Sequence, residues 1–289
     1  MSKSNTKQER PSPASLHLPP GGADSHAHLD GLVEKARTDE ERKEKLEAVM
    51  DLALGSGVST IGQVFLSPEA LERGRGWFDA WPQVFFLLGI HPNEAMQLTG
   101  QTLAAMRSWF AREPRLKAVG EIGLDLYWDD CPLVVQEEAF RLQLALAKEV
   151  KLPVVIHSRE AAEPTLNILE AEGLAGHPLL WHCFGGDDAI AVLDRLLANG
   201  WHISVPGPVT YPANTALREA VGRIPHDRLL LETDCPYLTP LPWRGKPNQP
   251  AFTAFTAQTV AACLGMEVAE LWALCGANTR RFFGLDGGA

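Results

Sequence analysis

Histidines and carboxylates that follow apolar runs are the residues in this chain best suited to chemistry. His26 and His28 lie two residues apart in DSHAHLD, so on an extended strand both side chains point to the same side. Histidine is the commonest protein ligand for metals. The pair therefore favours a metal site, although a histidine pair on the surface or in the core would have the same spacing.

Further polar residues end other apolar runs in the same way. They occur in VGEIGLD, PVVIHSRE, PLLWHCF and LLLETD. Burying unpaired polar groups is costly, so their equivalent placement predicts that they meet in one pocket. We expect the metal ligands to be His26, His28, Glu121, His157, His182, Glu232 and Asp234.

Imidazoles and carboxylates in these numbers suit two divalent ions, or three. We expect Glu121 to bridge and to take part in catalysis, because its strand would lie between the two histidine groups. His26, His28 and Asp234 would hold one ion, and His157 and His182 the other. Glu232 faces the same way as Asp234 and would hold a third ion or a water, or form a salt bridge within the barrel. Such ligands accept Mg, Mn, Zn or Co, so they do not select the metal.

Two further roles can be assigned beside the metal ligands. Asp234 is the first candidate for general base, the alternative being that it serves only as a ligand. Basic residues near strand ends would bind phosphate, because the guanidinium fork matches phosphate oxygens. These are His91, Arg159, Arg244 and Lys246. The alternatives are an ion pair for Arg159 and a solvated loop for Arg244 and Lys246.

Eight short apolar runs alternating with helical patterns would position these residues. The predicted strands are 23–29, 59–64, 84–90, 117–121, 153–157, 179–182, 201–205 and 229–234, and the predicted helices include 40–54, 133–150 and 189–199. This alternation predicts an α/β fold, a (β/α)₈ TIM barrel. Active sites of such barrels lie at the C-terminal ends of the strands, where the candidate ligands fall.

Composition limits the class of protein. The chain has 289 residues and a net charge of −10, which argues against binding a duplex or an anionic membrane by bulk charge. The apolar runs are too short to span a membrane, and five scattered cysteines fit a reducing cytoplasm. Residues 1–22 read as a disordered tail, which leaves one domain over 23–289. No obligate protein partner is evident.

Several sequence blocks together resemble a known family. DSHAHLD, LGIHPNEA, VGEIGLD, IHSREA, HCFGG, LLLETDCPYLTP and RGKPNQP, followed by ANTRRFFG, are similar to the TatD family of metal-dependent deoxyribonucleases, within the amidohydrolase superfamily. The resemblance covers about residues 23 to 285. It implies a TIM barrel with two or three metal ions, held by the seven ligand positions given above. It also implies hydrolysis of phosphodiester bonds, typically from the 3′ end of single-stranded DNA and sometimes RNA.

The leading hypothesis is therefore a metal-dependent 3′-5′ exonuclease in which a metal-activated water attacks single-stranded DNA or RNA ends. A second hypothesis keeps the metals but makes the substrate a small amide, ester or lactone. The basic residues His91, Arg159 and Arg244 favour the nuclease. A third, a catalytically silent barrel that binds a partner, is disfavoured by the complete ligand set. Gly185 and Gln249 replace the serine and glutamate usual in the family, which bears on substrate preference.

Overall fold

A parallel eight-stranded barrel forms the centre of the protein. The computed structural model describes residues 10–286. The strands are β1 (Gly22–Ala27), β2 (Val58–Phe65), β3 (Val84–Leu88), β4 (Leu116–Asp125), β5 (Val154–Arg159), β6 (Leu179–Trp181), β7 (His202–Val205) and β8 (Leu229–Leu231), paired in chain order. The barrel closes beyond β8, where the Asp234 amide donates to the His26 carbonyl at 2.9 Å. The predicted TIM barrel is confirmed.

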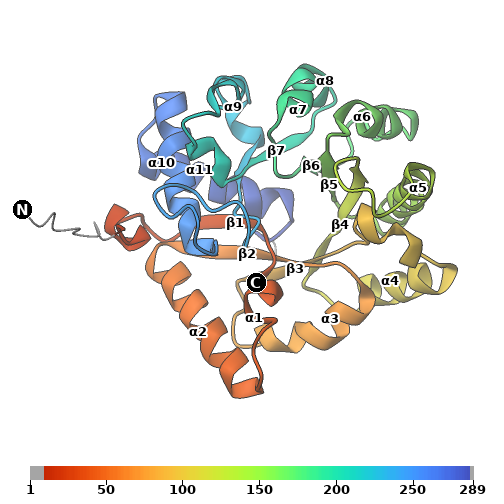
Figure 1. Ribbon diagram of the computed structural model, residues 1–289, viewed down its shortest axis with the longest axis horizontal. Coiled ribbons are helices and arrows are strands. Elements are labelled where there is room, and N and C mark those ends of the chain that lie inside the picture. Colours follow the sequence, from red (N-terminus) through yellow and green to blue (C-terminus); the bar gives the residue numbers. More distant parts are fainter. Residues whose placement is uncertain (1–9, 287–289) are drawn as a thin grey trace, which may run out of the picture.

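Helices surround these strands (Figure 1). They are α1 (Leu29–Val33), α2 (Asp39–Gly55), α3 (Pro68–Gly74), α4 (Gly100–Arg112), α5 (Leu133–Val150), α6 (Ala162–Ala171), α7 (Asp187–Ala191), α8 (Leu193–Ala198), α9 (Thr215–Val221), α10 (Thr253–Leu264) and α11 (Val268–Phe282). The helix predicted over 189–199 is wrong in extent, because the chain breaks at Val192 into α7 and α8.

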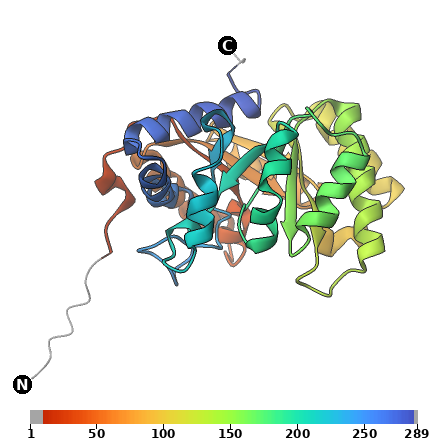
Figure 2. The same ribbon diagram turned by 90° about the horizontal axis from the view of Figure 1, so that it is seen from above.

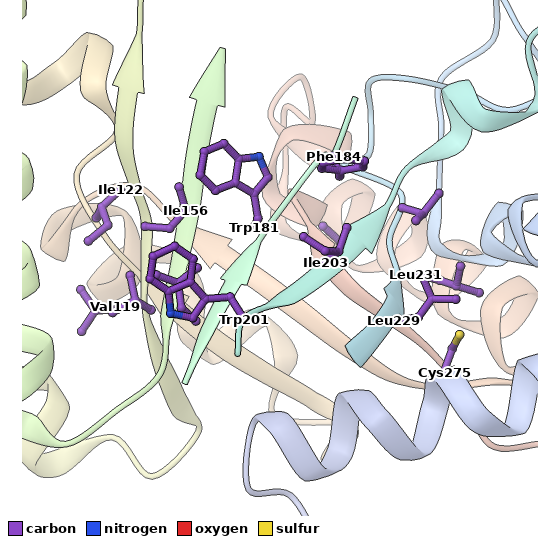
Figure 3. Packing of buried hydrophobic residues seen from close by; sticks show 14 of the residues in the cluster. Val119, Ile122, Ile156, Trp181, Phe184, Trp201, Ile203, Leu229, Leu231 and Cys275 are labelled. Atoms are coloured by element: carbon purple, nitrogen blue, oxygen red, sulfur yellow. The ribbon is translucent and has the colours of Figure 1, made fainter. Parts of the chain in front are cut away.

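Strand alternation divides the core into two layers. One set of side chains, including Ile156, Trp181 and Ile203, packs between the strands and the helices (Figure 3). The alternate set, including Val155, Leu180 and Leu230, forms a separate cluster that fills the barrel. The residues two positions beyond this second set are His157, His182 and Glu232, so alternation directs them to the mouth of the barrel.

The opposite end of the barrel is closed by α11, which lies across the side nearest the C-terminus (Figure 2). Phe282, the last residue of this helix, and Phe283, which follows it, pack with the interior residues Phe85, Val155 and Leu180. Because these aromatic rings block the N-terminal end, a substrate can enter only at the C-terminal ends of the strands.

Part of the predicted tail packs against the barrel. Pro13–Leu16 form a 3₁₀ helix. The indole Nε1 of Trp272 donates to the Pro19 carbonyl at 2.9 Å, and that of Trp243 donates to the Pro11 carbonyl at 2.8 Å. The expectation of a disordered tail over 1–22 is therefore wrong for residues 10–22, which tryptophans of the C-terminal third of the chain hold in place. Residues 1–9 lie outside the described residues.

Within residues 10–286, no single helix combines the length and apolarity needed to cross a bilayer. The bent pair of Pro250–Leu264 and Val268–Phe282 meets that criterion jointly, by length and composition only. Both helices contribute many buried side chains to the core.

Candidate metal centre

The first group of candidate ligands comes from β1 and the segment after β8. His28 Nε2 lies 3.4 Å from Oε1 of Glu121 and 3.4 Å from Oδ1 of Asp234. His26 Nε2 lies 3.7 Å from Oε2 of Glu121 and 3.9 Å from the same Asp234 oxygen. The structure therefore brings these four residues together, as expected from the sequence.

The second group approaches Glu121 from β5 and β6. Oε2 of Glu121 lies 2.8 Å from Nε2 of His182 and 3.4 Å from Nδ1 of His157. The rings of His26 and His182 stack with centroids 3.9 Å apart, which joins the two groups. One carboxylate thus contacts both groups of histidines, and this arrangement is what a bridging ligand between two ions requires.

Close approach of β4 to β5 places Glu121 at this point. The strand does not end at Glu121, as predicted, but continues to Asp125, and the pairing with β5 shifts register between Val119 and Ile122. A Cβ on Gly123 would lie 1.9 Å from the His157 carbonyl oxygen, and Gly123 has φ +151°. Only glycine permits this contact, so Gly123 allows Glu121 and His157 to lie side by side.

Glu232 lies behind His182 and is fully buried. It accepts a hydrogen bond from the Cys183 amide at 2.6 Å and another from the Ser204 hydroxyl. Its Oε1 is 3.5 Å from Nδ1 of His182. Glu232 is therefore placed to orient His182. It also belongs, with His182 and His26, to one of the groups that could hold a metal ion.

The residues present fit divalent metal ions. Both ring nitrogens of His26 are buried and have no hydrogen-bond partner anywhere in residues 10–286. Leaving such atoms unsatisfied is costly, and a bound cation would satisfy them. Groups of three ligand atoms that lie within 4.8 Å of one another are His26–His28–Glu121, Glu121–His157–His182, His26–His182–Glu232 and His91–Asp125–His157.

Charge in the cluster is distributed unevenly. Burial raises the pKa of Glu121, but the charge of His182 and hydrogen bonds from His157 and His182 outweigh it, and the pKa lies well below its usual range. Burial and the charge of His182 hold the pKa of His26 well below 6.5. Burial also lowers the pKa of His182, yet Glu232 and Glu121 raise it to about 10. Glu121 and His26 therefore favour the ionised carboxylate and the neutral imidazole, which are the forms that bind metals, whereas His182 would have to lose a proton to bind one.

Asp125 is a site residue that the sequence prediction missed. Its Oδ2 accepts a hydrogen bond from Nε2 of His157 at 3.0 Å. Its Oδ1 accepts from the amides of Tyr127 and Trp128 at 3.0 and 3.1 Å. A carboxylate that orients a ligand histidine in this way is usual at metal sites. The signal in the sequence was the aspartate of VGEIGLD, four residues beyond Glu121.

Asp24 is the second missed residue. It is fully buried and accepts hydrogen bonds from the amide of Thr233 at 2.9 Å and the hydroxyl of Thr233 at 2.5 Å. Burial, only partly offset by these bonds, raises its pKa to about 8. Asp24 precedes His26 by two residues and Thr233 precedes Asp234, so this contact holds β1 and the Asp234 segment in register.

The expected phosphate-binding residues divide into two groups. Nε2 of His91 lies 3.3 Å from Nδ1 of His157, and Arg159 lines the cavity above the cluster. Arg244 and Lys246 are exposed, and Arg244 stacks over Tyr211 at 4.2 Å. Neither of these two is among the described residues that line the cavity, so the structure does not bring them to the cluster.

The cavity itself has a volume of about 1600 Å³. Its floor includes His28, Glu121, His157, His182 and Asp234. Small-molecule pockets usually measure about 300–1,000 Å³. The space above the metal ligands is therefore larger than a small ester or lactone requires.

Comparison with known proteins identifies the family. The model of the TatD related DNase family matches residues 23–284. The chain belongs to this family. It is 36% identical over 263 residues to the uncharacterized metal-dependent hydrolase YabD of Bacillus subtilis, covering 91% of this chain and 99% of the relative. This membership makes the protein a metal-dependent hydrolase.

Other TatD relatives are named more specifically or have known structures. The 3'-5' ssDNA/RNA exonuclease TatD of Erwinia amylovora is 40% identical over 202 residues, covering 68% of this chain and 77% of that protein. The crystal structure of YJJV, a TatD homologue of Escherichia coli K12, superposes with a TM-score of 0.80 at 27% identity, covering 91% and 98% of the two chains. A lactonase of Deinococcus radiodurans, 15% identical with a TM-score of 0.65, shares the fold alone.

Proposed function

We propose that this TatD family hydrolase is a nuclease that cleaves phosphodiester bonds at single-stranded DNA or RNA ends, in the 3′ to 5′ direction. The observation that carries the proposal is the cavity of about 1600 Å³ over the Glu121 cluster, with Arg159 on its wall. The relative named as a 3'-5' ssDNA/RNA exonuclease supports the same class of substrate.

The ligand set favours two divalent ions. His26, His28 and Asp234 would hold one, His157 and His182 the other, and Glu121 both. Ions bound there would polarise the phosphoryl oxygen and make an attacking water more acidic. Glu232 would support His182 or take part in binding a further ion.

The chain's own residues supply the proton transfer and the contacts to the phosphate. Asp234 is the proton acceptor, because its side chain is partly exposed to the cavity beside His28. The amide of Asn93 donates to Nδ1 of His91, which leaves the proton of the neutral ring on Nε2. Burial and the charge of His157 lower the pKa of His91 to about 4, so the ring stays neutral. Its Nε2 hydrogen, directed at Nδ1 of His157 at 3.3 Å, would be available to a phosphate oxygen once that Nδ1 holds a metal.

A substrate panel tests the proposal. Metal-stripped protein would be reloaded with Mg, Mn or Zn and given single strands labelled at the 3′ or the 5′ end, the matching duplex and a closed circle. We expect shortening from the 3′ end of single strands. A set of small esters, amides and lactones belongs in the same experiment. Hydrolysis of these compounds by protein that leaves the DNA uncut would contradict the nuclease assignment.

A further inference from the structure

The loop after β4 exposes aromatic surface beside the metal cluster. Tyr127 and Trp128 are 48% and 50% exposed, and their rings meet edge to face with centroids 4.8 Å apart. Trp128 also lines the cavity that contains Glu121 and His157. An aromatic ring left half exposed at this point can contact whatever enters the cavity.

This loop is held in a defined conformation. The carboxylate of Asp125 accepts hydrogen bonds from the amides of Tyr127 and Trp128 while it also holds His157. One side chain, that of Asp125, therefore connects Trp128 to the candidate metal ligand His157. A contact surface fixed before binding loses less conformational entropy when it meets its partner.

Arg159 adds a cation to this surface. Its guanidinium lies 3.7 Å from the ring centroid of Tyr127 and 5.6 Å from that of Trp128. Across the described part of the chain, no carboxylate lies within 4.0 Å of it and its side chain makes no hydrogen bond. The ion pair considered as the alternative for Arg159 is thus not formed, and its donors are available to a ligand.

We propose that Trp128 stacks against an unpaired base of the substrate while Arg159 binds the adjoining phosphate. Proteins that bind single strands combine aromatic stacking surfaces with cations in this way. A base inside a duplex has both faces covered by its neighbours, so the contact selects unpaired ends. This inference rests on the proposed nuclease function and adds the residue that recognises the substrate as single-stranded.

A binding cycle tests the contact directly. The probes are an oligothymidylate with phosphorothioate linkages, which resist cleavage, and the same strand with one abasic residue at successive positions. The proteins are metal-loaded full-length wild type, Trp128→Ala, Trp128→Phe and the control Val134→Ala. Val134 is 71% exposed near the same loop but does not line the cavity. Binding is measured by fluorescence anisotropy and folding by circular dichroism.

We expect Trp128→Ala to raise Kd by about 5- to 150-fold, because stacking on an aromatic side chain contributes that much for each base. KM on cleavable strands should rise while kcat changes little. Trp128→Phe should recover most of the affinity, and Val134→Ala should bind like wild type. An abasic residue at one position of the strand should strongly weaken binding by wild type and hardly change binding by Trp128→Ala.

Equal abasic penalties in wild type and Trp128→Ala, or a folded Trp128→Ala with wild-type Kd, would overturn the stacking proposal. A loss in Val134→Ala as large as that in Trp128→Ala would also overturn it, since the exposed apolar surface would then act as a general contact for a macromolecule. If wild type cleaves the strands and Trp128→Ala has the same Kd and KM, the stacking contact is contradicted but the proposed function is not. A wild type that binds and cleaves no oligonucleotide overturns the proposed function as well.

Discussion

Nε2 of His157 donates a hydrogen bond to Asp125 at 3.0 Å, and this contact decides which nitrogen of the imidazole faces the cluster of candidate ligands. The other nitrogen, Nδ1, is left 3.4 Å from Glu121. Hydrogen bonding at one ring nitrogen fixes the tautomer and makes the other nitrogen a better ligand. Asp125 would therefore act on the proposed metal centre through His157.

Replacing this acceptor should weaken metal binding. Asp125→Asn keeps the size of the side chain but substitutes an amide for the carboxylate that faces His157. We expect a 10–100-fold loss of metal affinity, the usual effect of removing such a partner. Titration of stripped protein with Zn or Mn measures it. Asp129→Asn, in the same loop but outside the cavity lining, is the control, and equal affinities in the two variants would contradict the role of Asp125.

Loss of a ligand histidine should abolish activity without unfolding the chain. His157→Ala and His182→Ala each remove one ligand, and we expect turnover on single-stranded DNA to fall below detection with the circular dichroism spectrum unchanged. His177→Ala is the matched control. His177 lies 3.0 Å from the Leu152 carbonyl, where β5 and β6 begin, and therefore at the end of the strands opposite the candidate ligands. Turnover in both ligand variants at the level of the control would refute the assignment.

Substitutions of Asp234 and Arg159 should affect different kinetic constants. Asp234→Asn removes the proposed proton acceptor and should lower kcat by about 10²-fold or more. Arg159→Ala should mainly raise KM, because it removes a contact to phosphate. Single-turnover rates at saturating oligonucleotide, with metal content measured in each variant, separate the two effects. If Asp234→Asn retains its metals and the wild-type rate, another group takes the proton, and Glu232 is the next candidate.

Gly123 should tolerate no side chain. In Gly123→Ala the new Cβ would collide with the His157 carbonyl oxygen, so β4 and β5 must separate. We expect the free energy of unfolding to fall by at least about 1–3 kcal/mol, because the backbone of β5 cannot move aside easily. Metal binding should become weaker as well. Gly100→Ala is the control, since nothing lies within 4 Å of its Cβ. Urea unfolding compares them, and equal midpoints would show that the strands accommodate the methyl group.

His202 should make the protein less stable in mild acid. Burial, with the charges of Arg228 and Arg281, lowers its pKa to about 4, whereas an unfolded chain has a histidine pKa of about 6.5. Between these values the unfolded chain binds the additional proton, so stability falls as pH decreases from 6.5 towards 4. His202→Gln should reduce this slope. Urea unfolding across that pH range measures the difference, and identical slopes would contradict it.

The barrel and most of the ligand geometry follow from local patterns in the sequence. Alternation along a strand places His157 and His182 on the same side as Val155 and Leu180, which fill the barrel. Parallel strands that end at one face then bring distant residues together. The ends of the strands therefore sufficed to predict that the histidines converge, whereas Glu121 meets them from within β4, which continues to Asp125.

The features that were missed depend on contacts between distant segments. β4 shifts its register with β5 and continues to Asp125, and no local pattern in VGEIGLD shows either feature. Asp24 was passed over because its partner Thr233 lies at the other end of the chain. Residues 10–21 have a disordered composition, yet Trp243 and Trp272 provide hydrogen bonds that order them.

The most direct test of a metal-dependent nuclease built around Glu121 is a reloading titration. Metal-stripped protein would receive increasing amounts of Mn or Zn, and bound metal and release of nucleotides from a uniformly labelled single strand would be measured in the same samples. We expect stripped protein to release no nucleotides, and activity to appear as the metal content approaches two ions per chain. In Glu121→Gln both binding and release should be lost. Full release by the metal-stripped wild type would contradict the account.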